Sequence, residues 1–260
     1  MATTISDRVG AYVRAHATLR LLELLDPPTV RSLVPGRISI QLRTPGGPAC
    51  HILVRDGSIR FSGHPRLFPS GTLWFPSPVH MTRVLTGQKG SAIPVPTSPR
   101  FVSALTGFRK LTGALQEQFA SAAARPRFLL GGTLFALQEV AGRDPYVTSR
   151  VRRIPDGTIA ITTADLSADG LEVEGWFTRQ GSAITTGIGP LPAEADGSKA
   201  RPNAVLEFKD RDAAVALLSG TIPAMLALAE RSVRLYGRLP MIQNLFPILD
   251  RVAHYMGGGK

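Results

Sequence analysis

The side chains that could do chemistry are few and far apart in this sequence. Its five histidines are His16, His51, His64, His80 and His254, and no two of them form a close helical or hairpin pair. No phosphate-binding P-loop, no GxGxxG turn after a strand and no HExxH helix is present. The sequence therefore predicts no metal site and no cofactor.

Two local groups have residue types that occur in catalysis. Cys50 and His51 are neighbours, and alternation along a strand would point them to opposite faces, which argues against a dyad. Glu172 and Glu174 would share a face with Trp176, as an acid/base pair beside an aromatic wall requires. The solvent face of a hairpin explains the same pattern more simply. We therefore predict no catalytic residue.

Composition is typical of a globular protein. The chain has 260 residues, of which 43% are hydrophobic, and it contains one cysteine, 26 glycines and 21 prolines. No unbroken apolar run approaches the about 20 residues of a membrane-spanning helix. The N-terminal residues have scattered charges and lack a signal-peptide core. A cytoplasmic location is expected.

The net charge of +11 lies almost entirely in the first half of the chain. Residues 1–125 contain 15 basic and 5 acidic residues, whereas residues 126–260 contain 15 and 14. Such asymmetry suggests docking to an acidic protein or an anionic membrane surface, although an arginine-rich soluble surface also explains it. The candidate docking residues near helix ends and loops are Arg83, Lys89, Arg100, Arg109 and Lys110.

Nucleic acid is a less favoured partner for this basic half. Base recognition in single strands depends on aromatic side chains interleaved with the basic ones. Only Trp74, Phe101 and Phe108 lie near the candidate docking residues. Lipid or protein docking is therefore favoured over nucleic-acid binding.

A repeated plan runs through the chain. "TLWFPSPVHMTRVLTG" (72–87) and "VLEFKDRDAAVALLSG" (205–220) both run as a strand, a polar turn and a helix that ends in Thr-Gly or Ser-Gly. Two further anchors follow the same order: "VRDGSIRF" (54–61) matches "IPDGTIAI" (154–161), and "LTG" (105–107) matches "LYG" (235–237). The sequence thus predicts two copies of one domain, at 1–124 and 125–260, the second with an inserted hairpin around 165–200.

Periodicity gives the expected elements of each copy. In the first, we expect helices over 9–25, 78–85 and 108–124, and strands over 38–44, 51–61, 72–75 and 100–107, with a hairpin turn at Asp56-Gly57. In the second, we expect helices over 128–140, 211–218, 222–230 and 241–255, and strands over 147–153, 158–162, 170–189, 204–208 and 232–236. Because strands and helices are grouped, the predicted class is α+β.

The second copy resembles the sterol carrier protein type two family. The resemblance is carried by "LLSG" (217–220) and "VRLYGRLPMIQNL" (233–245), and more weakly by "RVLTG" (83–87) and "ALTGFRKL" (104–111) in the first copy. In the first copy, "IPVPTSPR" (93–100) departs from the family pattern, with three prolines in place of a short helix. The resemblance implies two units, each a small mixed or antiparallel sheet covered by helices on one face.

The resemblance also implies an apolar tunnel between these layers, in which family members hold sterols, fatty acyl chains or isoprenoids. The apolar face of the last helix and the short helix with Met225, Leu226 and Leu228 fit such a pocket, and they equally fit an ordinary core. The candidate ligand-binding residues are Trp176, Phe177, Val215, Leu218, Met225, Leu226, Leu228, Leu235, Ile242, Leu245, Phe246 and Leu249.

Three functions follow from this interpretation. The leading one is non-enzymatic binding or transport of an apolar, lipid-like ligand in the second copy. The second is an enzyme that isomerises or cyclises an apolar substrate in the same pocket. The third is a ligand-free scaffold subunit whose basic half docks an acidic partner. The sequence leaves the oligomeric state open.

Overall fold

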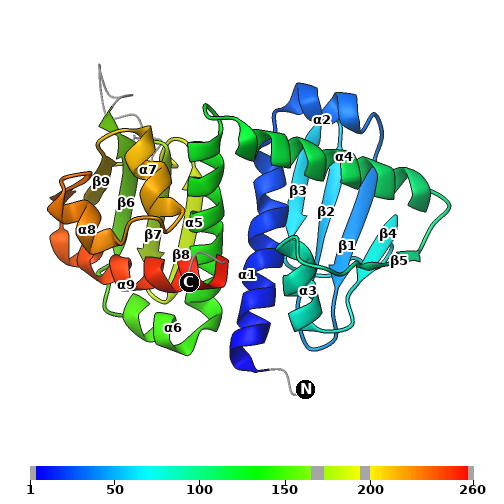
Figure 1. The fold of residues 1–260 in the computed structure, drawn as a ribbon, viewed down its shortest axis with the longest axis horizontal. Coiled ribbons are helices and arrows are strands. Elements are labelled where there is room, and N and C mark those ends of the chain that lie inside the picture. The colour runs from blue at the N-terminus through cyan, green and yellow to red at the C-terminus, as the bar shows by residue number, and fades with distance from the viewer. Residues whose placement is uncertain (1–3, 165–172, 194–199, 257–260) are drawn as a thin grey trace. The chain divides into compact units, whose positions relative to one another are not determined.

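The chain folds into two units. In this computed structural model the described residues are 4–164, 173–193 and 200–256, and the chain divides at residue 121 into Met1–Ser121 and Ala122–Lys260. The two units are α+β, and each consists of a five-stranded mixed sheet with helices on one face (Figure 1). Among the described residues, no helix has the length and apolar character needed to cross a membrane.

The first unit begins and ends with its long helices. Its helices are α1 (Ile5–Leu21), a short 3-10 turn η1 (Leu22–Leu24), α2 (Pro27–Leu33), α3 (Pro78–Leu85) and α4 (Phe101–Ala120). Its strands are β1 (Ile38–Arg43), β2 (Ala49–Arg55), β3 (Ser58–Ser62), β4 (Gly71–Trp74) and β5 (Ile93–Pro96). The strand order is β3-β2-β1-β4-β5, and only the central β1–β4 pair is parallel.

The second unit has the same plan with one helix added. Its helices are α5 (Arg125–Arg143), α6 (Pro145–Val151), α7 (Arg211–Leu218), α8 (Ala224–Ala229) and α9 (Leu239–Met256). Its strands are β6 (Gly157–Thr163), β7 (Gly175–Gln180), β8 (Ala183–Ile188), β9 (Ala204–Phe208) and β10 (Val233–Gly237). The strand order is β10-β9-β6-β7-β8, with only β6–β9 parallel.

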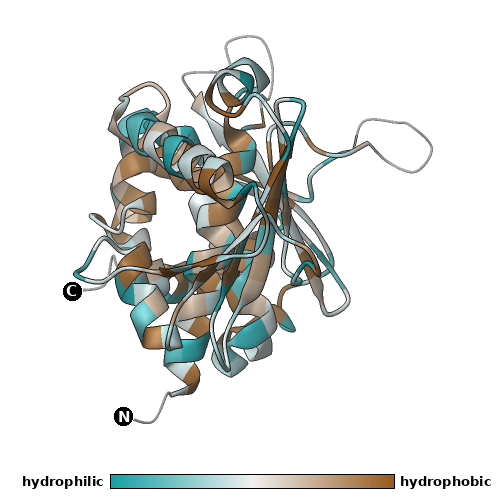
Figure 2. Cartoon of the chain, turned by 90° about the vertical axis from the view of Figure 1, so that its right-hand side faces the viewer, coloured by the Kyte–Doolittle hydropathy of each residue, from teal (hydrophilic) through white to brown (hydrophobic). Residues whose placement is uncertain are grey.

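Strand register makes the correspondence between the units specific. Ile40 in β1 pairs with Gly71 in the parallel strand β4, and Ile159 in β6 pairs with Ala204 in β9. The matched strands are therefore β1 with β6, β2 with β7, β3 with β8, β4 with β9 and β5 with β10. Figure 2 shows hydrophobic (brown) and hydrophilic (teal) residues recurring along the helices, as amphipathic helices that cover a sheet require.

The alternating segment around Gly175–Ile188 is not an insertion. It forms β7 and β8, which occupy the places that β2 and β3 hold in the first sheet. Both hairpins have two-residue turns, and the predicted Asp56-Gly57 turn is confirmed, with φ of 52° and 79°. The extra length of the second unit lies instead in α8 and in two longer connections, 164–174 and 189–203.

Two predicted strands are helices, so two of the three proposed anchors are wrong. Residues 101–107 belong to α4, and the edge strand β5 is the proline-containing 93–96, as prolines are tolerated at a sheet edge. Residues 147–151 belong to α6, because Asp144 caps that helix and Pro145 occupies its first turn. Asp156-Gly157 consequently leads into β6 and forms no hairpin, unlike Asp56-Gly57.

The remaining anchor, the match of 72–87 with 205–220, corresponds to a pair of helices with matching caps. Ser77 and Asp210 accept the first-turn hydrogen bonds of α3 and α7. At the other end, Gly87 and Gly220 both have φ of 74°, the left-handed conformation that closes a Schellman motif. The six-to-one bonds run from the N–H of Gln88 to the C=O of Arg83 (2.9 Å) and from the N–H of Thr221 to the C=O of Ala216 (2.9 Å). The repeated Leu-Thr-Gly and Leu-Ser-Gly sequences are therefore helix stops.

Candidate functional site

An apolar pocket lies among three helices of the second unit. Its volume is about 240 Å³. Its walls come from α5, from α7 and the segment that follows it, and from the second half of α9. The lining residues are Thr133, Leu217, Leu218, Gly220, Ile222, Pro223, Leu249, Asp250, Val252, Ala253, His254 and Met256. Eight of these twelve side chains are apolar, so the pocket suits an apolar guest.

The helix cap after α7 sets one wall of this pocket. The left-handed conformation of Gly220 ends α7 and turns the chain, which then leads through Ile222 and Pro223 into α8. The first unit connects α3 directly to β5 over residues 86–92, half the length of the 219–232 connection between α7 and β10. The wall made by Ile222 and Pro223 therefore depends on the additional α8 segment.

Helix α9 supplies the other wall through helical periodicity. Leu249, Val252, Ala253 and Met256 recur three and four residues apart, which places them on one stripe. The polar residues Asp250 and His254 flank that stripe. The helix thus presents an apolar surface to the pocket and ionisable groups beside it.

Asp250 and His254 also line a shallow, solvent-open depression on the second unit. The depression has a volume of about 520 Å³ and is otherwise lined by Tyr146, Pro247 and Arg251. Both Asp250 and His254 are exposed. The two hollows therefore share a polar margin, with a carboxylate and an imidazole one helical turn apart.

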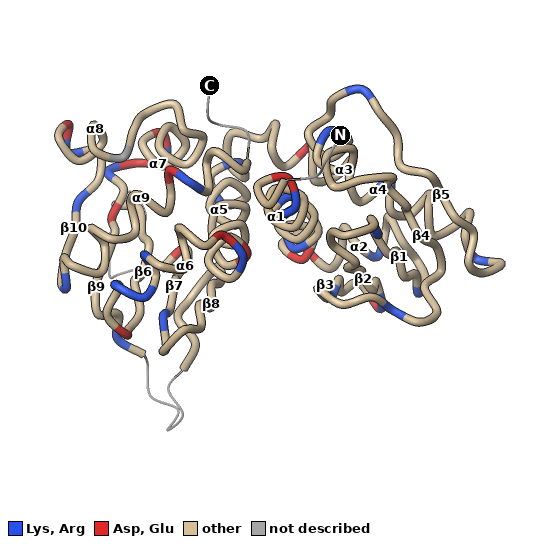
Figure 3. The backbone as a smooth tube through the Cα atoms, turned by 90° about the horizontal axis from the view of Figure 1, so that it is seen from below, with Lys and Arg blue, Asp and Glu red and all other residues tan. Residues whose placement is uncertain are grey.

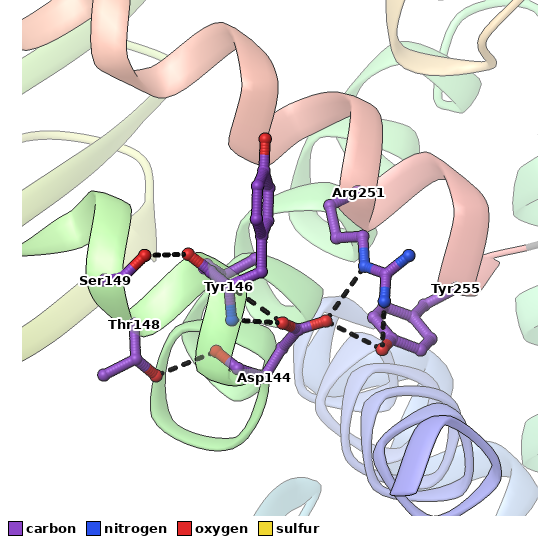
Figure 4. Close-up of polar contacts among 7 residues, drawn as sticks. Asp144, Tyr146, Thr148, Ser149, Arg251 and Tyr255 are labelled. Atoms are coloured by element: carbon purple, nitrogen blue, oxygen red, sulfur yellow. Dashed lines mark hydrogen bonds and ion pairs between the residues drawn. The ribbon is translucent and has the colours of Figure 1, made fainter. Parts of the chain in front are cut away.

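A buried carboxylate fixes α9 to the α5–α6 junction (Figure 4). Asp144 is 2% exposed and accepts hydrogen bonds from the N–H groups of Tyr146 (2.9 Å) and Val147 (3.3 Å), which caps α6. Its other oxygen accepts from Arg251 Nε (2.9 Å) and from the hydroxyl of Tyr255 (2.8 Å). Arg251 also lies over the Tyr255 ring, 5.0 Å from its centre.

The electrostatics of this cluster favour its charged form. Burial acts to raise the pKa of Asp144, but the hydrogen bonds from Arg251, Tyr255 and the N–H of Val147 outweigh burial and hold that pKa below its ordinary value. The hydrogen bond to Asp144 in turn raises the pKa of Arg251. Since both ions are held in place, the cluster orients the α9 wall of the pocket.

The candidate ligand residues fall into four environments. Leu218 and Leu249 line the pocket. Phe177, Ile242, Leu245 and Phe246 are buried in the core of the second unit. Trp176, Val215, Leu228 and Leu235 are partly exposed, and Met225 and Leu226 are 71% and 46% exposed.

Met225 and Leu226 therefore lie at the surface and are not among the residues that line the pocket. Ala227 is buried in this short helix, whereas the larger Met225 and Leu226 are exposed. Trp176 and Phe177 lie on opposite faces of β7, because neighbouring strand residues alternate, and only Phe177 faces the core.

Several pocket residues were not among the sequence candidates. These are Thr133, Leu217, Gly220, Ile222, Pro223, Asp250, Val252, Ala253, His254 and Met256. The stripe of α9 could have been extended to Ala253 and Met256 from their spacing alone. By contrast, Thr133 on α5 joins the pocket only through tertiary packing, for which the sequence has no local signal.

The five candidate docking residues are all exposed. Arg83 lies on α3, Lys89 follows that helix, Arg100 precedes α4, and Arg109 and Lys110 lie on α4. Lys and Arg predominate in the first unit, whereas both signs of charge are spread over the second (Figure 3). Their role in docking stays a prediction.

The residues weighed for catalysis are not assembled into a site by the described structure. Cys50 is buried in β2, and the neighbouring His51 lies on the other face of that strand. Glu172 lies outside the described residues, so its pairing with Glu174 is not described. No group of three His, Cys, Asp or Glu side chains within the described ranges is arranged to hold a metal.

Comparison with known proteins assigns no family. No protein-family model and no curated protein matches this sequence. Among solved structures, the chain has some similarity to the solution structure of the sterol carrier protein domain 2 of Helicoverpa armigera. The two share 12% identity and a TM-score of 0.32, over 48% of this chain and 89% of that one. A similarity this weak carries no argument about function.

Proposed function

We propose that the second unit binds and carries a small apolar, lipid-like ligand in the pocket between α5, α7 and α9. The observation that supports this proposal is the pocket of about 240 Å³ with eight apolar lining side chains. Each methylene that moves from water into such a site contributes roughly 0.8 kcal/mol, so a short hydrocarbon chain would bind without charged contacts.

The pocket volume restricts the class of ligand. A cavity of about 150 Å³ accommodates benzene, and pockets for drug-sized molecules begin at roughly 300 Å³. At about 240 Å³, this pocket suits a medium-length or branched chain, such as a short fatty acyl or isoprenoid group. A whole sterol would require the α7–α8 segment to move outward.

Extraction is the direct test. The purified full chain would be extracted with organic solvent and analysed by mass spectrometry, with native mass spectrometry to count bound molecules. A stoichiometric apolar compound is the expected result. A protein that emerges empty and ignores a panel of fatty acids and isoprenoid alcohols of graded length would contradict the proposal.

A pocket-filling variant tests the location of the ligand. Ala253→Phe adds a phenyl ring to the pocket wall and should reduce binding of a fluorescent medium-chain fatty acid by about tenfold or more, because the space is then occupied. Ala229→Phe is the matched control, since Ala229 is exposed on α8 and does not line the pocket. Equal losses in the two variants would place binding elsewhere.

A second candidate function is isomerisation of the same ligand. It is favoured by Asp250 and His254, which line the pocket and could donate or accept a proton there. The test is whether the extracted compound, returned to the protein, changes with time. If the compound is converted, and His254→Ala abolishes conversion without loss of binding, the protein is an isomerase. If the compound stays unchanged, the carrier function is the one supported.

A further inference from the structure

The outer face of the first sheet is left uncovered by the helices of its unit. Helices α1 and α4 pack on the inner side, where alternate residues such as Ile40 and Leu42 are buried. The residues between them point outward, and register places Arg43 of β1, Arg55 of β2 and Arg60 of β3 on this side. All three arginines are exposed.

The β3–β4 loop lies across this outer face and presents two adjacent hydrophobic side chains to solvent. Leu67 is 90% exposed and Phe68 is 87% exposed, more than any other large hydrophobic residue among those described. A soluble surface rarely exposes two neighbouring large apolar residues so fully without a use for them. Arg66 precedes them directly in the sequence.

Hydrogen bonds hold this loop in one position. The N–H of Arg66 donates to the Gln41 side chain on the outer face of β1 (2.8 Å). The N–H of Ser70 donates to the C=O of Ser39 (2.8 Å), and the hydroxyl of Thr97 donates to the C=O of Pro69 (2.8 Å). These hydrogen bonds anchor the loop on both sides of Leu67 and Phe68.

Exposed apolar residues continue toward the edge of the same sheet. Ile93 and Val95 of β5 are 47% and 39% exposed, and register places both on the outer face, beside Trp74 of β4. The outer face thus combines a protruding apolar tip, an apolar edge strand and a partly exposed tryptophan.

Most of the charge on this surface is positive. The side chains of Arg43, Arg60 and Arg66 form no ion pair or hydrogen bond within the part of the chain that the structure describes. Asp56 adjoins this face and pairs with Arg55 at 3.0 Å, and Glu23 accepts a hydrogen bond from the N–H of Phe61 on β3 (2.7 Å). The surface therefore complements a negatively charged partner with an apolar interior.

We propose that the outer face of the first sheet docks on an anionic membrane surface, with Leu67 and Phe68 inserted among the lipids and Arg43, Arg60 and Arg66 at the headgroups. Apolar side chains that enter the interface and basic residues that contact anionic headgroups are the two contributions that hold peripheral proteins on membranes. This surface is separate from the predicted docking residues of α3 and α4, and it does not depend on the ligand pocket.

Vesicle co-sedimentation tests this docking. The full chain would be mixed with phosphatidylcholine vesicles that contain about a third phosphatidylglycerol, and with pure phosphatidylcholine vesicles. Binding is expected to the anionic vesicles, to fall with added salt and to be weak on the neutral ones. Equal binding to the two compositions, or to neither, would overturn the proposal.

Two pairs of variants locate the surface. Replacing Leu67 and Phe68 with Asp, or Arg60 and Arg66 with Glu, should lower the vesicle partition coefficient by about tenfold or more. The matched control is Val102→Asp with Arg109→Glu, which makes the same kinds of change at exposed positions of α4. If the control pair loses binding and the other variants keep it, α4 is the docking surface and the proposal is wrong.

The rival partner is tested in the same preparation. Fluorescence polarisation with a single-stranded RNA would detect nucleic-acid binding on this arginine-rich sheet. One outcome would identify RNA, and not a membrane, as the partner of this surface. In that outcome the protein binds no vesicles, and its RNA binding is lost when Arg60 and Arg66 are replaced but is kept when Leu67 and Phe68 are replaced with Asp. Circular dichroism confirms that each variant is folded.

Discussion

The two units share one sheet topology and differ in their connections and charge. Strand order, strand direction and the caps of α3 and α7 agree between them. They differ in α8, in connection lengths and in charge, since the first unit has almost all the excess basic residues. The apolar pocket is lined by residues of the second unit, and the arginine-rich outer sheet face belongs to the first. The two units therefore differ most in the segments that the sheets do not constrain.

The N-cap residues of α2 and α6 are equivalent in the two units but differ in burial and in hydrogen-bond partners. Asp26 and Asp144 each precede a proline and cap the second helix of their unit. Asp26 is exposed and accepts from the N–H of Thr29 (2.9 Å). Asp144 is buried and binds α9 as well as its own helix. The same sequence signal is thus a local cap in one unit and a tertiary link in the other.

The largest expected effect comes from removing that link. Asp144→Ala should lower the free energy of unfolding by about 3 kcal/mol, because it leaves Arg251 and the Tyr255 hydroxyl without their acceptor in a partly buried site. Thermal or urea denaturation followed by circular dichroism measures the change. Asp26→Ala is the matched control, and it should lower the free energy of unfolding clearly less than Asp144→Ala does. Equal losses would mean that Asp144 acts only as a helix cap.

A smaller effect is expected at the paired Schellman glycines. Gly87→Val and Gly220→Val should each destabilise the protein by about 1–2 kcal/mol, since a side chain is strained at a positive φ of this size. Only Gly220→Val should also weaken ligand binding, because Gly220 lines the pocket. Loss of binding in the Gly87 variant would indicate that the two units are coupled.

Acid should weaken the second unit through Asp144. Its pKa in the folded protein is held below its unfolded value of about 3.9, so its contribution to stability is present above that value and is lost as the pH falls through the folded pKa. The protonated carboxyl can still accept some of its hydrogen bonds, so this loss should be smaller than that of Asp144→Ala. Denaturation between neutral and acidic pH measures it. In the Asp144→Asn variant, the free energy of unfolding should depend less on pH. If its pH dependence is unchanged, Asp144 is not the group responsible.

The smallest effect is expected at the edge strand β10. Tyr236 donates a hydrogen bond to Glu207 at 2.9 Å on an exposed surface, and register matches it to Val95 of β5. Tyr236→Phe should change the free energy of unfolding by about 0.5 kcal/mol or less, because water replaces an exposed hydrogen bond. If the free energy of unfolding falls by several kcal/mol, Tyr236 is part of the packing of β10, and β10 is not an exposed edge like β5.

The sequence alone was sufficient for elements with strong local signals. Asp56-Gly57 predicted the first hairpin, and the capping residues around 77–87 and 210–220 predicted α3 and α7. These features depend on φ angles and hydrogen bonds within a few residues, so they can be recognised without the fold. The α+β class followed from the grouping of such elements.

Tertiary structure decided what short apolar runs become. "RFVSALTG" (100–107) and "VTSRV" (147–151) have strand-like composition, yet both are helical, because burial of Ala104, Gly107, Val147 and Val151 on one helical side outweighs weak local preference. Because 100–107 is not a strand, the segment 93–96, with its two prolines, forms the edge strand instead.

The sequence by itself determined the caps, the turns and the apolar stripe of α9, because these are set by neighbours along the chain. Only the fold decided that Thr133, Ile222 and Ala253 meet in one pocket, and that Asp144 reaches Arg251 from 107 residues away. It also decided that Met225 and Leu226 of α8 are exposed to water. The physical reason is that a pocket is made of space left between packed elements, and packing is a property of the whole unit.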